Sequence, residues 1–192
     1  METISGKAIW NEATKAGLMF GLVSVAYNHI SIYLGSLVGS SFLLNFFASV
    51  GVWLLRVAKI VGLILLMRAC MTRLTRNYSE VTNGDTFLLG IAISALSAII
   101  VAGFTLLDCT VLLPTHYQDL MNQVMAELQP SMDANLRSAM EDVLSNFSGI
   151  MFWSTLFYCI LYGVILSRIL SRRIPAQDPF ADFPHSDNPD QQ

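Results

Sequence analysis

Charged residues are scarce in this chain of 192 residues, where Asp, Glu, Lys and Arg together make up only 13%. Soluble domains average about 25% charged residues. Hydrophobic residues make up 54% of the chain, and they stand in long blocks. The shortage of charge argues against a water-soluble domain, and the blocks indicate an integral membrane protein whose first partner is the lipid bilayer.

The chain also has few of the residues that usually build active sites, with three cysteines and three histidines. The cysteines lack the CxxC spacing of metal sites, and no zinc-hydrolase, serine-hydrolase or nucleotide-binding motif is present. The histidines fall in three separate compartments of the topology derived below: His29, His116 and His185. We therefore expect no enzyme activity, no cofactor and no metal.

Four apolar stretches are long enough to cross a membrane, for which a helix needs about 20 residues. The longest runs from Phe42 to Met67 and is interrupted only by Asn45, Arg56 and Lys59. The predicted spans are residues 16–38, 46–67, 86–107 and 147–166. The sequence thus predicts an all-α fold, with a four-helix membrane bundle over residues 16–174.

Basic residues predict the orientation of these spans, because cytoplasmic loops are rich in Lys and Arg. Arginines follow the second span at 68–76 and the fourth at 168–173, whereas the segment 109–146 is acidic apart from Arg137. Both termini are therefore expected in the cytoplasm. Residues 1–15 read as an amphipathic N-terminal segment, and the proline-rich acidic residues 175–192 read as a disordered tail.

The external segment 109–146 has the pattern of two amphipathic helices. A capping-box pattern at Thr115–Gln118 precedes the first, and Pro130 ends it before Ser131 caps the second. The two apolar faces are Tyr117, Leu120, Met121, Val124 and Leu128, then Met132, Leu136, Met140, Val143 and Phe147. We expect them to lie on the outer membrane surface or on the mouth of the bundle. A binding lid is the alternative.

Small residues form a stripe along the first span, and such stripes let helices approach closely. Its candidate helix-packing residues are Gly17, Gly21, Ser24 and Gly35. Asn28 lies on the same face, which we expect to meet the second span.

A polar cluster is predicted deep in the membrane. Arg56 and Lys59 are three residues apart and share one face of the second span. Counting from the flanking basic residues puts Arg56 and Asn28 roughly 18–20 Å from the cytoplasmic interface, with His29 and Lys59 at a similar level. Asp108 closes the third span.

Two interpretations of this cluster stay open. In the structural one, Arg56 reaches outward to Asp108 or to lipid phosphate, and helix carbonyls and water hold Lys59. In the functional one, an uncompensated basic pair attracts an anion, a lipid headgroup or a proton, because ionisable residues inside a membrane are functional candidates.

Four sequence features carry a resemblance to a known family: MRACMTRLTRNY after span two, NGDTFLLG at the start of span three, the long helical segment from Tyr117 to Leu144, and the terminal SRILSRR. They cover about residues 10–174. The chain resembles an uncharacterised family of small four-span bacterial inner-membrane proteins grouped under a domain of unknown function. The resemblance implies a bacterial inner-membrane location and no site residues, since the family has no assigned activity.

These observations favour a non-enzymatic association or accessory protein, packing with copies of itself or with another membrane protein through its small-residue stripes. The alternative is a small transporter or channel subunit that uses the Arg56–Lys59 pair. A membrane enzyme acting on lipid comes last, because no acid–base pair shares one depth. Nucleic acid is not an expected partner, since the basic residues flank the spans and have no aromatic platform.

Overall fold

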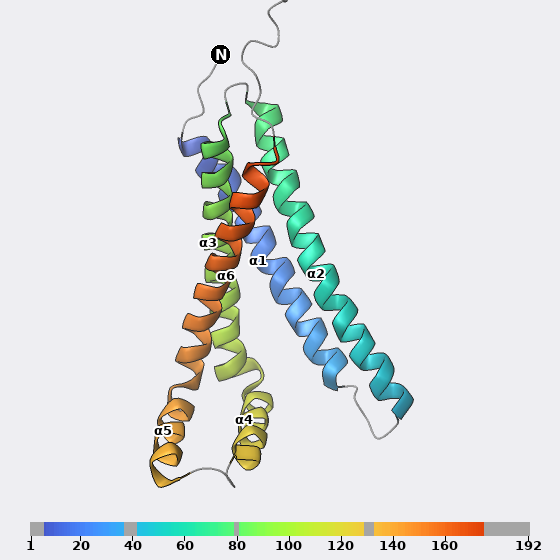
Figure 1. Ribbon diagram of the computed structural model, residues 1–192, viewed down its shortest axis with the longest axis vertical. Helices are drawn as coiled ribbons and strands as arrows, with labels where there is room; N and C mark the ends of the chain where they lie inside the picture. Colours follow the sequence, from blue (N-terminus) through green and yellow to red (C-terminus); the bar gives the residue numbers. More distant parts are fainter. Residues whose placement is uncertain (1–5, 37–41, 79–80, 129–132, 175–192) are drawn as a thin grey trace, which may run out of the picture.

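The computed structural model describes residues 6–36, 42–78, 81–128 and 133–174. Of these residues 94% are helical and none lies in a strand, which confirms the all-α prediction. The elements are α1 (Gly6–Ser36), α2 (Phe42–Asn77), α3 (Asn83–Leu107), the short π-helical turn η1 (Asp108–Leu112), α4 (Pro114–Leu128), α5 (Ala134–Ser145) and α6 (Phe147–Ser171), and Figure 1 shows their arrangement. The predicted tail at 175–192 and the predicted cap at Ser131 lie outside the described residues.

Four of the described helices are long and apolar enough to cross a membrane. Their ranges are Gly6–Gly35, Asn45–Asn77, Asn83–Leu112 and Phe147–Ser171. Each corresponds to one of the predicted spans, and each is longer than the span predicted for it. α1 begins at Gly6, so residues 6–15 belong to the same helix as the first span.

The start of α3 is fixed by a capping box that sequence analysis did not identify. The Thr82 hydroxyl accepts a hydrogen bond from the Asp85 backbone N–H at 3.2 Å, and an Asp85 carboxylate oxygen accepts one from the Thr82 N–H at 3.0 Å. This reciprocal pair satisfies two backbone donors that a helix start leaves free. α4 instead begins at Pro114, where a missing N–H costs nothing. Thr115 therefore lies inside the first turn, not at the N-cap that the predicted Thr115–Gln118 box requires.

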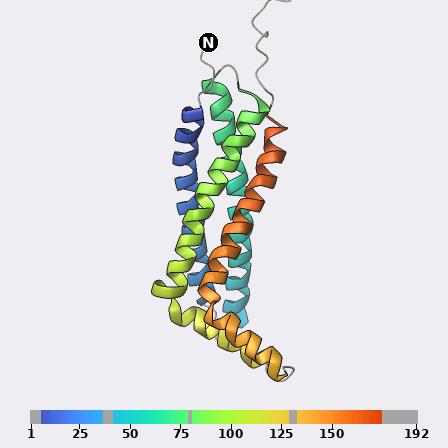
Figure 2. The same ribbon diagram turned by 90° about the vertical axis from the view of Figure 1, so that its left-hand side faces the viewer.

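The helices pack around α3, which lies against α1 along one side and against α6 along another. Gly17 and Gly21 make the α1–α3 approach possible, because a Cβ at either position would come within 2.8 Å of Leu96 or Ile100. α2 packs mainly against α1 and has few contacts with α3 and α6. In Figure 1, α1 and α2 diverge from α3 and α6 toward the end that carries α4 and α5. Figure 2 shows the same helices side by side from a second direction.

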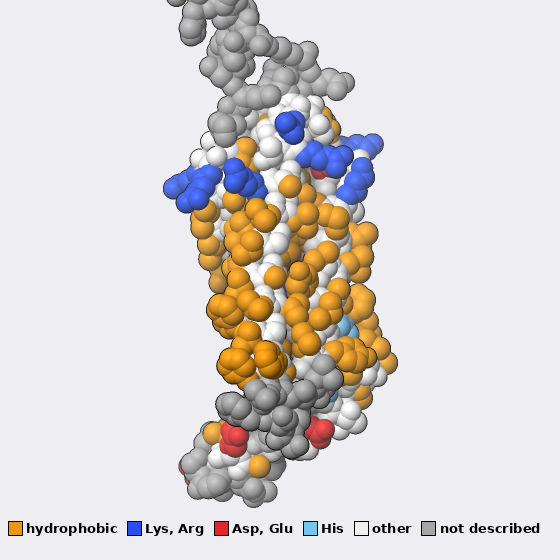
Figure 3. Space-filling model, turned by 90° about the vertical axis from the view of Figure 1, so that its right-hand side faces the viewer, with side chains coloured by type: hydrophobic (Ala, Val, Ile, Leu, Met, Phe, Trp, Pro, Cys, Tyr) orange, Lys and Arg blue, Asp and Glu red, His pale blue; other side chains and the backbone are white. Residues whose placement is uncertain are grey.

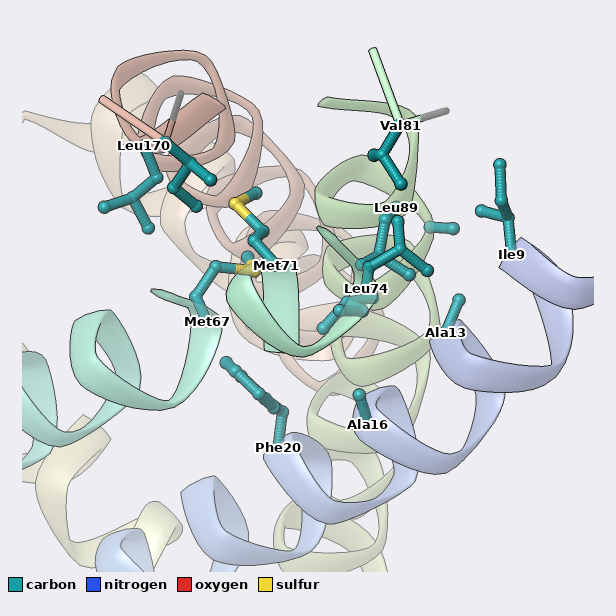
Figure 4. Packing of buried hydrophobic residues seen from close by; sticks show 13 residues of the cluster. Ile9, Ala13, Ala16, Phe20, Met67, Met71, Leu74, Val81, Leu89 and Leu170 are labelled. Atoms are coloured by element: carbon teal, nitrogen blue, oxygen red, sulfur yellow. The ribbon is translucent and has the colours of Figure 1, made fainter. Parts of the chain in front are cut away.

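The hydrophobic core lies at the opposite end, where all four long helices meet (Figure 4). Phe20 of α1, Met71 of α2 and Leu89 of α3 are almost fully buried there, and Leu170 of α6 packs with them. The Ser167 hydroxyl donates to the Phe87 carbonyl oxygen at 2.9 Å and joins α6 to α3. This end holds the start of α1, the end of α2, the start of α3 and the end of α6.

Charge distinguishes the two ends of the molecule. The Lys and Arg side chains visible in Figure 3 form a belt across the end that holds the core, where Glu12 and Asp85 also lie, and further acidic side chains lie at the other end. We call these the basic end and the acidic end. The acidic end comprises η1, α4, α5 and the neighbouring parts of the long helices.

Candidate functional site

A cavity of about 290 Å³ lies between the four long helices, on the acidic side of the core. Its walls are mainly apolar, with Phe20 and Val101 on two of them. The hydroxyls of Ser94 and Ser97 also line it, but they already donate to carbonyl oxygens of α3, so they offer few free hydrogen-bond groups. α2 contributes, in order, Arg56, Lys59, Ile60, Leu63 and Met67. The side chains of Arg56 and Lys59 therefore lie where the cavity comes nearest to the acidic end of the molecule, and most of the remaining cavity wall is apolar.

Lys59 joins α2 to α1 through one hydrogen bond. Its Nζ donates to the Asn28 side-chain oxygen at 2.9 Å. An ammonium group carries three donors, and within the described part of the chain the other two have no recorded partner. The hydrogen bond to Asn28 therefore holds the Lys59 side chain in place, and it uses one of the three ammonium donors.

Arg56 is the least satisfied group of the site. Its side chain is exposed, and among the described residues it makes no hydrogen bond or ion pair. Arg68, at the basic end, lies about three helical turns away, or roughly 18 Å. A guanidinium ion carries five donors and stays charged. A full positive charge therefore lies on a helix of membrane-spanning length without a partner among the residues that the structure describes.

A second, more polar cavity of about 340 Å³ lies toward the acidic end. Arg56 and Lys59 line this cavity too, so they are common to the apolar and the polar space. Its other walls include Asn28 and Ser31 of α1, Thr105 of α3, Asp108 of η1 and Tyr117 of α4. Tyr117 is half-buried, and burial, with smaller contributions from Cys109 and Asp108, raises the pKa of its phenol.

Asp108 is buried where α3 passes into η1, and His29 is its neighbour. The His29 Nε2 lies 3.2 Å from one Asp108 carboxylate oxygen, and their side chains are 29% and 7% exposed. The His29 Nδ1 lies 3.0 Å from the Val25 carbonyl oxygen of the preceding turn. Asp108 therefore faces His29 in this structure, and the Arg56–Asp108 pair of the structural interpretation is not formed.

The structure brings four members of the predicted polar cluster into two contacts at one level. Asn28 contacts Lys59, and the next residue, His29, contacts Asp108. Adjacent residues of α1 thereby link it to α2 on one side and to η1 on the other. Arg56 shares the polar cavity with Asp108 and has no direct contact with it.

The predicted helix-packing residues have different surroundings. Gly17 and Gly21 contact α3, although sequence analysis expected their face to meet the second span. Ser24 lines the apolar cavity, and Gly35 has open space around it. Of the small and polar residues along this face of the first span, Asn28 is the one that forms a hydrogen bond with α2, at Lys59.

Sequence analysis missed the part of the cavity that α6 supplies. Tyr158, Cys159 and Tyr162 line it, and the two tyrosine rings are stacked with centroids 6.4 Å apart. The one available signal was the spacing of four residues between the tyrosines, which places them on one helix face. That spacing does not reveal which helix the face meets.

No cluster of three or more His, Cys, Asp or Glu side chains that could hold a metal ion occurs among the described residues. Comparisons with family models, with curated proteins and with solved structures find no match for this chain. The resemblance to a four-span bacterial family stays a prediction, and the site has to be interpreted from its own geometry.

Proposed function

We propose that the chain is a multi-pass protein of the bacterial inner membrane, in which the four long helices form a bundle with both termini in the cytoplasm. The belt of Lys and Arg at the basic end supports this orientation, because positive side chains mark the cytoplasmic side. α4 and α5 then lie at the outer surface as amphipathic helices. α4 supports this placement, since none of its residues is buried and Leu120 and Val124 are left exposed.

Within this bundle, we propose that the protein binds an anionic phospholipid of the surrounding bilayer and does not catalyse a reaction. The headgroup phosphate would contact Arg56 and Lys59, and one acyl chain would occupy the apolar cavity. The observation that carries this proposal is the position of Arg56 at the end of a mainly apolar cavity, with no ion pair to any other described residue.

Charge complementarity favours an anion at this position. A cation at membrane depth is costly unless a countercharge or water accompanies it, and among the described residues no carboxylate is paired with Arg56. Arg binds phosphate oxygens in a bidentate manner, and Lys59 retains donors beyond its bond to Asn28. An anionic headgroup would satisfy both side chains at once.

The shape of the cavity favours a lipid over a free anion. Beyond Arg56 and Lys59 the walls of the cavity are mainly apolar as far as Met67, and such a surface stabilises hydrocarbon better than a hydrated ion. Ile60 and Tyr158 line the cavity and are also exposed on the outer surface of the helices. A lipid can therefore enter sideways from the bilayer, between α2 and α6.

Association with copies of itself or with another membrane protein stays a prediction, and no contact favours it over lipid binding. Gly17 and Gly21, which it was expected to use, contact α3 within the chain. Of the proposed packing residues, Gly35 is the one with open space around it.

Thermal unfolding in a neutral detergent tests lipid binding. We expect dioleoyl phosphatidylglycerol to raise the unfolding temperature more than dioleoyl phosphatidylcholine, which has the same acyl chains, because a ligand of the folded state stabilises it. Arg56→Gln with Lys59→Gln should remove the difference. The matched control is Arg76→Gln, an exposed arginine near the end of the same helix, which should retain it.

Two further experiments distinguish the contribution of the lipid headgroup from that of the acyl chain. Leu63→Trp should fill the apolar cavity and weaken binding of the lipid, with Arg56 and Lys59 intact. Inorganic phosphate should stabilise far less than the lipid at equal concentration. Equal stabilisation by phosphatidylcholine, or by phosphate alone, would contradict the proposal, as would a full response of the Arg56→Gln, Lys59→Gln variant.

A further inference from the structure

The polar cavity of about 340 Å³ has hydrogen-bond donors and acceptors on different walls. Arg56 and Lys59 of α2 can only donate, and the Asn28 amide, whose oxygen contacts the Lys59 Nζ, lies beside them. Ser31 of α1 and Thr105 of α3 line other walls. Each of these two hydroxyls already donates to a carbonyl oxygen of its own helix, at 2.9 Å, so its oxygen is left as an acceptor. A ligand that fits the cavity therefore accepts hydrogen bonds from α2 and donates hydrogen bonds to the other walls.

Asp108 of η1 is the charged acceptor of this cavity. Its side chain is 7% exposed, and its Oδ1 is buried and accepts no hydrogen bond from a described residue. The His29 Nε2 lies 3.2 Å from that oxygen, in a geometry that does not make a hydrogen bond. A buried carboxylate oxygen without a donor is costly. A ligand that brings a donor of its own to Asp108 would remove this cost.

Arg56 and Lys59 connect the polar cavity to the apolar one, because they line both. The inference drawn from this connection rests on the lipid binding proposed above. With the phosphate on these two cations and an acyl chain in the apolar cavity, the rest of the headgroup extends away from the chain, into the polar cavity. The volume of about 340 Å³ is within the range of small-molecule sites, about 300–1,000 Å³. The groups beyond the phosphate therefore decide which phospholipid fits.

We propose that the site selects a phospholipid whose headgroup carries hydroxyl groups beyond the phosphate, the chemistry of phosphatidylglycerol. The phosphate oxygens accept hydrogen bonds from Arg56 and Lys59. One glycerol hydroxyl donates to the Asp108 carboxylate, and the second donates to a neighbouring hydroxyl oxygen, that of Ser31 or Thr105. Hydrogen bonds to a charged group are stronger than those between neutral groups, so Asp108 contributes most of the selectivity.

Formal charge distinguishes phosphatidylglycerol from the zwitterionic phospholipids. The two cations Arg56 and Lys59 and the one anion Asp108 give the lining of the cavity a net positive charge. The single negative charge of phosphatidylglycerol balances it, whereas phosphatidylcholine and phosphatidylethanolamine carry no net charge. The choline group also has no N–H or O–H to donate. Charge and hydrogen bonding therefore favour the same headgroup.

Native mass spectrometry of the full chain in a neutral detergent tests the proposal, because it measures the affinity of each lipid. We expect dioleoyl phosphatidylglycerol to bind about tenfold more tightly than dioleoyl phosphatidylmethanol, which has the same acyl chains and charge but no hydroxyl, since one hydrogen bond to a charged group is lost. Asp108→Leu should reduce this ratio to about one and leave phosphatidylmethanol bound at least as tightly, because it removes an anion. The matched control is Asp119→Leu, an exposed carboxylate of α4, which should keep the ratio.

The comparison of the two lipids on the wild type does not depend on any variant. Asp108→Leu should also fold, because an apolar side chain of similar shape replaces a buried carboxylate that lacks a hydrogen bond. Equal binding of the two lipids by the wild type would overturn the selectivity and leave lipid binding intact. Binding of neither lipid more tightly than dioleoyl phosphatidylcholine would overturn both proposals. A ratio that persists in Asp108→Leu, or tighter binding of dioleoyl phosphatidylethanolamine than of phosphatidylglycerol, would overturn the selectivity alone.

Discussion

The two ends of the molecule are built from the same four helices and packed in opposite ways. At the basic end, side chains from all four helices interlock around Met71 and Leu89. Toward the acidic end, cavities open between the helices, and the contacts that remain there include Asn28–Lys59 and His29–Asp108. Close packing stabilises the first region, and polar groups occupy the second.

The difference originates in α2. Of the residues in its apolar window only 6% are buried, against 44% for α3. α2 is held at the basic end by Met67, Met71 and Leu74 and diverges beyond them. A helix that is packed closely at one end and more loosely at the other can admit a ligand without loss of the core, because local stability differs along a structure. Four experiments test this difference between the two ends.

The largest effect is expected where three helices meet at the basic end. A Cβ at Gly90 would overlap Ser167 and lie 2.6 Å from the Met71 Cε. Gly90→Leu should therefore lower the free energy of unfolding by about 3 kcal/mol, the upper range for overpacking. Gly103→Leu on the same helix is the control, since nothing lies within 4 Å of its Cβ position. Unfolding in mixed micelles measures both, and equal losses would refute the tight packing of this end.

A smaller loss is expected from a cavity in the same core. Leu89 is 1% exposed and its neighbour Leu88 is 53% exposed. Leu89→Ala should cost about 2 kcal/mol, because it removes packing contacts that cannot close up. Leu88→Ala should change little, since that side chain faces lipid. The same unfolding assay measures both variants. If Leu88→Ala lowered the free energy of unfolding as much as Leu89→Ala, α3 would have to be rotated about its axis relative to this structure.

At the acidic end, a double-mutant cycle of Asn28→Ala and Lys59→Met measures the link between α1 and α2. We expect a coupling energy of about 1 kcal/mol, typical of hydrogen bonds between membrane helices. Ser31→Ala is the matched control on α1, because the Ser31 hydroxyl donates within its own helix, to the Tyr27 carbonyl oxygen. It should show no coupling to Lys59→Met. Zero coupling for Asn28 would mean that the two helices are unlinked at this level.

The smallest effect concerns pH at the acidic end. Burial raises the pKa of Tyr117, so its neutral phenol is favoured in the folded state. The resulting stabilisation is complete below about pH 10, where free tyrosine titrates, and is lost as the pH rises through the folded pKa. Absorbance at the tyrosinate band, taken as the difference between wild type and Tyr117→Phe, measures this titration. Ionisation at or below the ordinary tyrosine range would place Tyr117 in water.

Sequence reasoning located the polar level because depth along a helix is a local property. A rise of about 1.5 Å per residue put Asn28 and Lys59 at one height, and a hydrogen bond joins them. The same reasoning assigned the wrong neighbour to Gly17 and Gly21, which contact α3. It also placed a capping box at Thr115, whereas the box that forms is Thr82–Asp85. Rotation about a helix axis and the first residue of a helix both depend on neighbours that periodicity does not identify.

Four apolar spans and the uneven distribution of charge followed from the sequence alone, because each depends on the residues of one segment and their affinity for water or lipid. The packing of the helices was needed to show that α2 diverges from α3 and α6, that Tyr158 and Tyr162 line a cavity beside Arg56, and that His29 faces Asp108. Those contacts join positions far apart in the chain. They depend on which helix faces pack, and helices of nearly uniform hydrophobicity do not encode that choice individually.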